Sequence, residues 1–122
     1  MQIRIVSWNI RRANKKNTLV WNKILSFKAD ILLLQEVTSF PKHIYDIYKI
    51  KARKAVTKNG TLQSFHTAVL VKHEIDAEIK LFSKIDWVNK ELAFFDGNLV
   101  ACRVNINNKY FNIISVYSPA WP

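Results

Sequence analysis

The stretch Ala29-Asp30-Ile31-Leu32-Leu33-Leu34-Gln35-Glu36-Val37 joins a continuous apolar run to two polar residues. A run as short as 31–34 is typical of a strand covered on both faces, because such a strand needs no alternation of apolar and polar side chains. We expect Gln35 and Glu36 to lie where this strand leaves the core. A carboxylate held there by a rigid element, and partly desolvated, is suited to binding a cation. The alternative for Glu36 is a solvated residue at a strand end.

The N-terminal stretch Ile3-Arg4-Ile5-Val6-Ser7-Trp8-Asn9-Ile10-Arg11-Arg12 is also rich in β-forming residues, and its strand pattern ends at Asn9. A segment of helix length separates it from the apolar run at 31–34. If the two strands lie side by side, the amide of Asn9 and the carboxylate of Glu36 meet at one end of the sheet. Two arginines, Arg11 and Arg12, follow directly.

Apolar periodicity and turn signals predict about seven strands and two helices, an α/β (α+β) pattern that fits half of a layered sandwich. Asn107-Asn108 favours a tight hairpin turn between the last two strands. The stretch 83–98 has no clear period. The expected strands are 3–8, 31–34, 47–56, 65–72, 77–82 (paired with 65–72), 99–106 and 110–117; the expected helices begin near Asn17 or Thr18 and near Pro41.

The 122 residues suit one domain, and their formal net charge is +10. Residues 1–60 hold 13 Lys/Arg and 3 Asp/Glu, whereas residues 61–122 hold 6 of each. The whole excess of positive charge therefore falls in the half that contains Asn9 and Glu36. Such a field attracts polyanions, so we expect nucleic acid as a partner. The alternative is an ordinary solvated charged face.

A single cysteine, Cys102, makes an intrachain disulfide impossible, which fits a reducing compartment. Charged residues interrupt the first 30 residues throughout, and the chain has no long apolar segment. These features argue against a signal peptide or a membrane span, and we expect a cytoplasmic protein.

Four stretches resemble motifs of the endonuclease/exonuclease/phosphatase superfamily. They are 7–11 (Ser-Trp-Asn-Ile-Arg), 30–37 (Asp-Ile-Leu-Leu-Leu-Gln-Glu-Val), 67–71 (Thr-Ala-Val-Leu-Val) and 113–120, which contains Tyr-x-Pro. They stand in family order. The superfamily includes DNase I-like and exonuclease III-like enzymes, and the pairing of Asn-Ile-Arg with Gln-Glu-Val is most similar to the DNase I-like members. The resemblance implies that residues 1–122 are the N-terminal part of such a domain, the first half of a four-layered α/β sandwich.

The same resemblance implies the chemistry of metal-assisted phosphoester hydrolysis, with Mg²⁺ or Mn²⁺. It implies Glu36 as the metal ligand, with Asn9 beside it at the metal or the phosphate. Tyr117, the tyrosine of Tyr-x-Pro, would hydrogen-bond a phosphate oxygen, so that Asn9, Glu36 and Tyr117 form the catalytic set. Arg11 and Arg12 would bind the substrate, because a guanidinium grips phosphate through two hydrogen bonds.

The family's second half normally supplies an Asp-x-Asn pair and an Asp-His pair, which activates the attacking water. No Asp follows Asp96 here and no His follows His73. We therefore expect the C-terminal half of the domain to be absent, little catalysis by this chain alone, and association through a sheet that lacks its cover.

Three interpretations remain open from the sequence. The first is part of a nuclease that hydrolyses the phosphodiester bonds of nucleic acid. The second is a phosphatase of inositol phosphates or phospholipids, which a basic surface also permits. The third is a truncated, non-catalytic remnant that binds nucleic acid or a partner chain. Fold-level resemblance does not choose the reaction within this superfamily.

Overall fold

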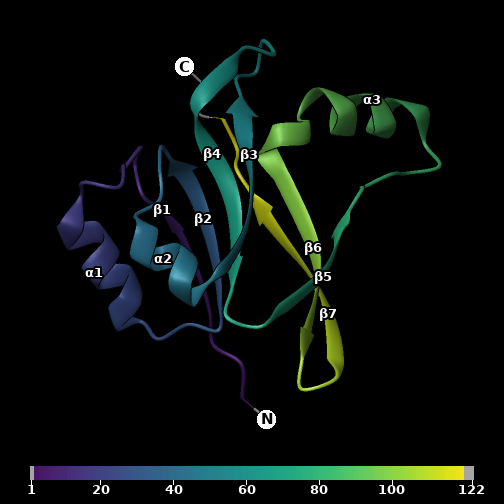
Figure 1. Cartoon of the computed structure of the whole chain (residues 1–122). Helices are drawn as coiled ribbons and strands as arrows, with labels where there is room; N and C mark the ends of the chain where they lie inside the picture. The colour runs from purple at the N-terminus through teal and green to yellow at the C-terminus, as the bar shows by residue number, and fades with distance from the viewer. Residues whose placement is uncertain (1, 120–122) are drawn as a thin grey trace.

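The computed structural model describes residues 2–119, which form seven strands, three α-helices and one short 3₁₀ helix (Figure 1). The elements in chain order are β1 (Ile5–Asn9), α1 (Thr18–Ser26), β2 (Ile31–Val37), α2 (Lys42–Ile47), β3 (Lys49–Val56), β4 (Leu62–Val71), β5 (Glu74–Ile79), α3 (Asp86–Phe94), η1 (Asp96–Asn98), β6 (Leu99–Ile106) and β7 (Lys109–Val116).

The strands make two sheets that pack face to face. The first has the order β1-β2-β4-β3, with β1 parallel to β2 and the other pairs antiparallel. The second has the order β5-β6-β7 and is antiparallel throughout. Helices α1 and α2 cover the face of the first sheet that points away from the second (Figure 1). The predicted α/β class is thus confirmed.

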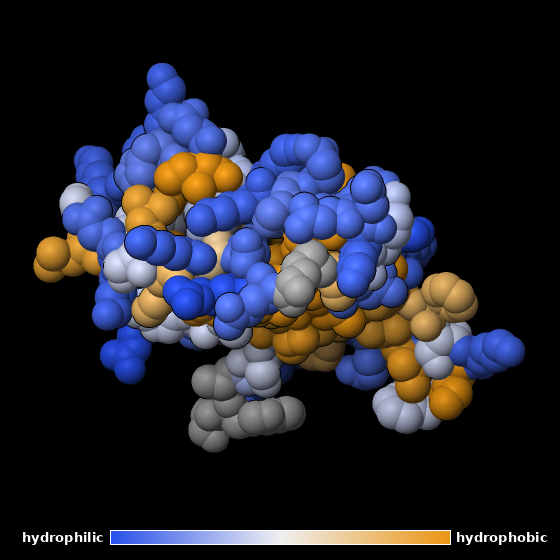
Figure 2. All heavy atoms as spheres, turned by 90° about the horizontal axis from the view of Figure 1, so that it is seen from below, coloured by the Kyte–Doolittle hydropathy of each residue, from blue (hydrophilic) through white to orange (hydrophobic). Residues whose placement is uncertain are grey.

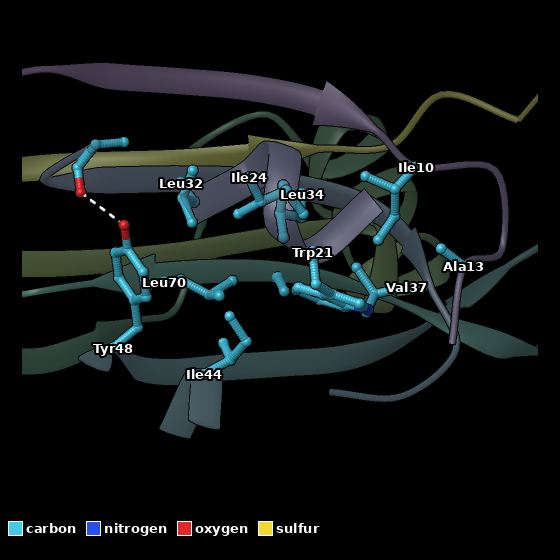
Figure 3. Packing of buried hydrophobic residues seen from close by; sticks show 12 residues of the cluster. Ile10, Ala13, Trp21, Ile24, Leu32, Leu34, Val37, Ile44, Tyr48 and Leu70 are labelled. Carbon is cyan, nitrogen blue, oxygen red and sulfur yellow. Dashed lines mark hydrogen bonds between the residues drawn. The ribbon is translucent and has the colours of Figure 1, made fainter. Parts of the chain in front are cut away.

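Strand β2 is buried on both faces, as its unbroken apolar run predicts. Leu32 and Leu34 point into the core beneath the helices, where they meet Trp21 and Ile24 of α1 (Figure 3). Ile31 points the other way, into the core between the sheets. One polar atom that this packing buries is satisfied by a hydrogen bond: the Tyr48 hydroxyl donates to the Ala29 carbonyl at 2.8 Å.

The expected pairing of strand 77–82 with strand 65–72 is wrong. β5 pairs with β6 instead, because β4 already has β2 and β3 as its neighbours. The short Lys72-His73 connection carries the chain from the first sheet to the second. Ile75 of β5 then packs on the apolar core between the sheets.

The number of helices also differs from the prediction, because residues 2–119 contain a third α-helix. α3 has no fully buried residue; its half-buried positions Val88 and Leu92 lie four residues apart, a short spacing that the sequence reading of 83–98 missed. The predicted Asn107-Asn108 hairpin turn is confirmed, with φ values of 52° and 64°.

Large apolar side chains are exposed mainly around α3 and along β7, and Figure 2 shows apolar side chains among polar ones on the face seen from below. The exposed apolar residues around α3 and along β7 are Phe82, Ile85, Trp87, Phe94, Tyr110, Ile114 and Val116.

No helix in the described part of the chain is long and apolar enough to cross a membrane.

Candidate functional site

Parallel pairing of β1 and β2 brings the two predicted polar strand ends together. Asn9 pairs in register with Gln35, and the Asn9 Nδ2 donates a hydrogen bond to the Glu36 Oε2 at 2.7 Å. The hydrogen bonds between the two strands continue one residue beyond the end of β1, since the Ile10 N–H donates to the Gln35 carbonyl at 3.0 Å. The juxtaposition expected from the sequence is therefore present at the carboxyl end of both strands.

A β-bulge sets the direction of the Glu36 side chain. Leu34 pairs with Ala68 and Val37 with His66, so β2 has one more residue than β4 across this interval. Glu36 itself adopts φ = 54°, in the left-handed region, which costs about 1–2 kcal/mol for a residue that carries a Cβ. Bulges of this kind re-aim side chains next to functional sites. The Glu36 side chain keeps 20% of its surface exposed.

A tight turn after β1 fixes the orientation of the Asn9 amide. Arg11 and Arg12 both adopt left-handed φ values, 52° and 63°. The Arg11 N–H then donates to the Asn9 Oδ1 at 3.0 Å, while the Asn9 Nδ2 faces Glu36. The amide therefore presents a donor, rather than an oxygen, to the carboxylate. Arg11 reaches the site through its backbone, and its side chain is exposed.

The Arg12 guanidinium lies between an acid and an aromatic ring. Its Nε is 3.6 Å from the Glu36 Oε1, and its Cζ is 5.0 Å from the centre of the buried Phe65 ring. Phe65 in turn meets the Tyr117 ring edge to face, with 5.5 Å between ring centres. Arg12, Phe65 and Tyr117 thus form a continuous row beside Glu36.

Tyr117, just beyond β7, brings the second sheet to the site. Its N–H donates to the Asn98 carbonyl at 2.8 Å. Burial raises the pKa of the Tyr117 phenol, the negative charge of Glu36 raises it further, and Arg12 partly offsets this. The phenol consequently stays protonated at neutral pH and is available as a hydrogen-bond donor.

Four predicted site residues, Asn9, Arg12, Glu36 and Tyr117, are therefore neighbours. The sequence did not point to Phe65 or Asn98. Gln35 was expected where the strand leaves the core, but its side chain is buried and points between the sheets. Of the Tyr-x-Pro stretch, residues through Pro119 are described, whereas Ala120 lies outside the described residues.

The donor set fits a water-rich cation site better than an enclosed one. Within residues 2–119, no group of three or more His, Cys, Asp or Glu side chains could hold a metal ion. Glu36 is the acid among the four site residues. Mg²⁺ is often bound through one or two carboxylates, with waters and substrate phosphate completing its coordination, and a single half-buried carboxylate is compatible with that mode.

Basic residues gather on the loop that follows β1, namely Arg11, Arg12, Lys15 and Lys16. Hydrogen bonds pin this loop to the segment after β2: the Thr38 Oγ1 donates to the Arg12 carbonyl at 2.9 Å, and the Lys15 N–H to the Ser39 Oγ at 2.8 Å. The loop therefore carries four positive charges, of which the Arg12 guanidinium is the one in contact with Glu36.

The basic residues of β3 are placed differently. Arg53 pairs with Glu78 of β5 at 2.7 Å and with Asp96, and Lys49 pairs with Glu74. These ion pairs join the two sheets, so part of the positive excess predicted from the sequence is neutralised there. The other two basic residues of β3, Lys51 and Lys54, are exposed. The basic side chain in contact with Glu36 is that of Arg12, on the loop after β1.

Comparison with protein-family models gives no match, and no curated protein sequence matches the chain. Among solved structures, the chain is similar to the endonuclease domain of TRAS1, a telomere-specific non-LTR retrotransposon, with a TM-score of 0.53 and 18% sequence identity. The similarity covers 95% of this chain and 46% of that one, so this chain spans about half the length of the structure it matches. At this identity the likeness shows the fold alone.

Proposed function

We propose that this chain is part of a divalent-metal-dependent nuclease that hydrolyses phosphodiester bonds of nucleic acid. The observation that carries the proposal is the hydrogen-bonded Asn9–Glu36 pair, which faces Tyr117 and a basic loop. The similarity of the fold to an endonuclease domain supports it. Four positive charges on the loop after β1 favour a polyanionic substrate.

In this proposal Glu36 is the protein ligand of Mg²⁺ or Mn²⁺. The bound cation would neutralise charge on the phosphate and stabilise the leaving oxygen. Asn9 would orient the Glu36 carboxylate, because its Nδ2 donates a hydrogen bond to the Glu36 Oε2. Direct ligation by the Asn9 Oδ1, which accepts one hydrogen bond from the Arg11 N–H, stays the alternative prediction for this residue.

The remaining site residues would bind the phosphate. The protonated Tyr117 hydroxyl would donate to a phosphate oxygen, and Arg12 and Arg11 would pair with its charge. None of these groups is a general base suited to activating water at neutral pH. We therefore propose that cleavage needs further residues of a nuclease domain, and that this chain by itself binds the cation and the phosphate without rapid turnover.

Paramagnetic Mn²⁺ tests the cation site without requiring catalysis. We expect low concentrations of Mn²⁺ to broaden the backbone NMR signals of Asn9, Glu36 and Tyr117 before others. Glu36→Gln should abolish this selective broadening. Glu74→Gln is the matched control, because Glu74 is an exposed acid on β5 that pairs with Lys49. Equal broadening in Glu36→Gln, or broadening centred elsewhere, would refute Glu36 as the ligand.

Ligand comparison separates the substrate classes. Short DNA and RNA duplexes, single strands and an inositol phosphate would each be titrated with Mg²⁺ present. A nuclease is supported if nucleic acid shifts the signals of residues 11–16 at lower concentration than the inositol phosphate does. The reverse order would support the phosphatase interpretation. Loss of the effect at high salt would show that phosphate contacts dominate.

A further inference from the structure

The proposed site depends on the alignment of two sheets that apolar packing alone does not set. Glu36 belongs to the first sheet, whereas Tyr117 follows the last strand of the second. Between the sheets lie apolar side chains such as Val69 and Val104. Apolar contacts are non-directional, so buried hydrogen bonds are better suited to fixing the relative position of two packed layers.

One buried bridge crosses between the sheets just beneath the site. The Gln35 Nε2 donates to the Ser115 Oγ at 3.1 Å, and the Ser115 Oγ donates to the Leu34 carbonyl at 3.3 Å. Ser115 is fully buried. Ser115 stands two residues before Tyr117, just as Leu34 stands two residues before Glu36. The bridge therefore couples the ends of the two strands that carry the site.

A second contact holds Tyr117 directly. The buried Asn98 accepts a hydrogen bond from the Val56 N–H at 2.7 Å through its Oδ1 and donates to the Val56 carbonyl at 3.0 Å through its Nδ2. Its own carbonyl accepts from the Tyr117 N–H. One residue thus joins the end of β3, in the first sheet, to Tyr117.

Gly97 makes the second contact possible. A Cβ built on Gly97 would lie 1.7 Å from the Lys54 carbonyl oxygen, so no larger residue fits where η1 approaches β3. This close approach lets the following residue, Asn98, reach the backbone of Val56 with both atoms of its amide.

We propose that Ser115, Gln35 and Asn98 are positioning residues that hold Tyr117 opposite Glu36 across the two sheets. The inference rests on the proposed function for the role of Tyr117, but its geometry stands on contacts of this chain alone. None of the three residues touches the phosphate in this proposal. Their effect on the site passes through the placement of Tyr117.

Ser115→Ala and Gln35→Met test the bridge, because each removes one hydrogen-bonding group with little change in side-chain size. Thr67→Val is the matched control: the Thr67 hydroxyl is also buried but has no hydrogen-bond partner. The readouts are nuclear Overhauser contacts between the Tyr117 and Phe65 rings, hydrogen exchange at the Tyr117 amide, and urea unfolding.

We expect both bridge variants to lose at least half of the Tyr117–Phe65 contact intensity and to exchange the Tyr117 amide about tenfold faster. Thr67→Val should leave both quantities unchanged. These readouts are local, so they separate a positioning role from a general loss of stability, which urea unfolding measures. If Ser115→Ala does not fold, Gln35→Met decides the question, because it leaves the Ser115 hydroxyl in place.

Native-like contact intensity and exchange at Tyr117 in a folded Ser115→Ala or Gln35→Met variant would overturn the proposal. No metal or nucleic acid enters this experiment. A failure of Mn²⁺ to bind near Glu36 would therefore contradict the proposed function and leave this result unaffected, whereas an undisturbed Tyr117 would contradict the positioning role alone.

Discussion

The Arg12 guanidinium lies beside the Glu36 carboxylate, which is the group that the proposed cation would bind. Its Nε lies 3.6 Å from the Glu36 Oε1, and its own side chain is largely exposed. An ion pair with one solvent-exposed partner contributes only about 1 kcal/mol or less, so a divalent ion would displace Arg12 at small cost. The guanidinium, stacked on the Phe65 ring, would then be available to a phosphate next to the metal.

Arg12→Gln should therefore strengthen cation binding and weaken phosphate binding. We expect Mn²⁺ affinity to rise up to about fivefold, the equivalent of about 1 kcal/mol, as measured by calorimetry. Nucleic-acid affinity should fall in the same variant. Arg11→Gln is the control for the change in net charge, because Arg11 contacts Asn9 through its backbone. An equal rise in Mn²⁺ affinity in both variants would show that Arg12 acts only through long-range charge.

At the scale of single residues, the sequence predicts those site positions that local pattern marks. Asn9 and Glu36 each end an apolar strand run, which places them before any pairing is known. Ser115 and Asn98 hydrogen-bond to Leu34 and Val56, which are more than 40 residues away in the sequence, so local pattern carries no sign of these contacts. The bulge at Glu36 likewise depends on the register between β2 and β4.

Among the elements, β1 is an edge strand of the first sheet and depends on Asp30 for its anchorage. The Arg4 N–H donates to the Asp30 Oδ2 at 2.8 Å, and the Asp30 N–H donates to the Arg4 carbonyl at 2.8 Å. The His73 Nε2 lies 3.2 Å from the Asp30 Oδ1. The hydrogen bond from Arg4 lowers the pKa of Asp30 most; His73 and Lys72 lower it further, and burial opposes them.

A lowered pKa in the folded state means that ionised Asp30 stabilises the fold at neutral pH. This contribution is lost as the pH falls below the ordinary carboxyl range and through the lowered pKa. We expect Asp30→Asn to reduce the free energy of unfolding by about 1–2 kcal/mol at pH 7, and by less at pH 3, in urea titrations.

Asp46→Asn provides the control, since Asp46 is an exposed acid on α2. It should change the free energy of unfolding by less than about 0.5 kcal/mol at either pH. If Asp30→Asn destabilises the protein equally at pH 7 and pH 3, the carboxylate charge is not what anchors β1.

Elements whose apolar residues repeat at a clear helical or strand spacing could be predicted from the sequence, and elements without such a spacing could not. The apolar spacing of α1 and the unbroken run of β2 both predict the structure that forms. α3 buries no residue fully, and exposed apolar side chains such as Trp87 and Phe94 obscure the helical spacing of its half-buried Val88 and Leu92. Adjacent strands usually pair, which favours a β4–β5 hairpin. The chain instead crosses between the sheets at Lys72-His73, β5 pairs with β6, and Ile75 packs on the core between the sheets.

At the scale of the whole molecule, residues 2–119 form two apolar cores that share β2 and β4. One lies beneath the helices and contains Trp21, whose indole N–H donates to the Asn14 carbonyl at 2.9 Å. The other lies between the sheets and contains Cys102, which is fully buried. Burial raises the pKa of the Cys102 thiol to about 11, so the native protein exposes no reactive thiolate at neutral pH.

Because both cores use the same two strands, they should unfold as one cooperative unit. We expect Cys102 to resist a thiol-specific disulfide reagent in the native protein and to react along the same urea curve that abolishes the native NMR signal of the Trp21 indole. Coincident curves mean that the second sheet cannot leave the first without global unfolding, and so that Tyr117 cannot leave Glu36. Reaction of Cys102 at urea concentrations where the Trp21 signal persists would mean that β5, β6 and β7 detach on their own, taking Tyr117 with them.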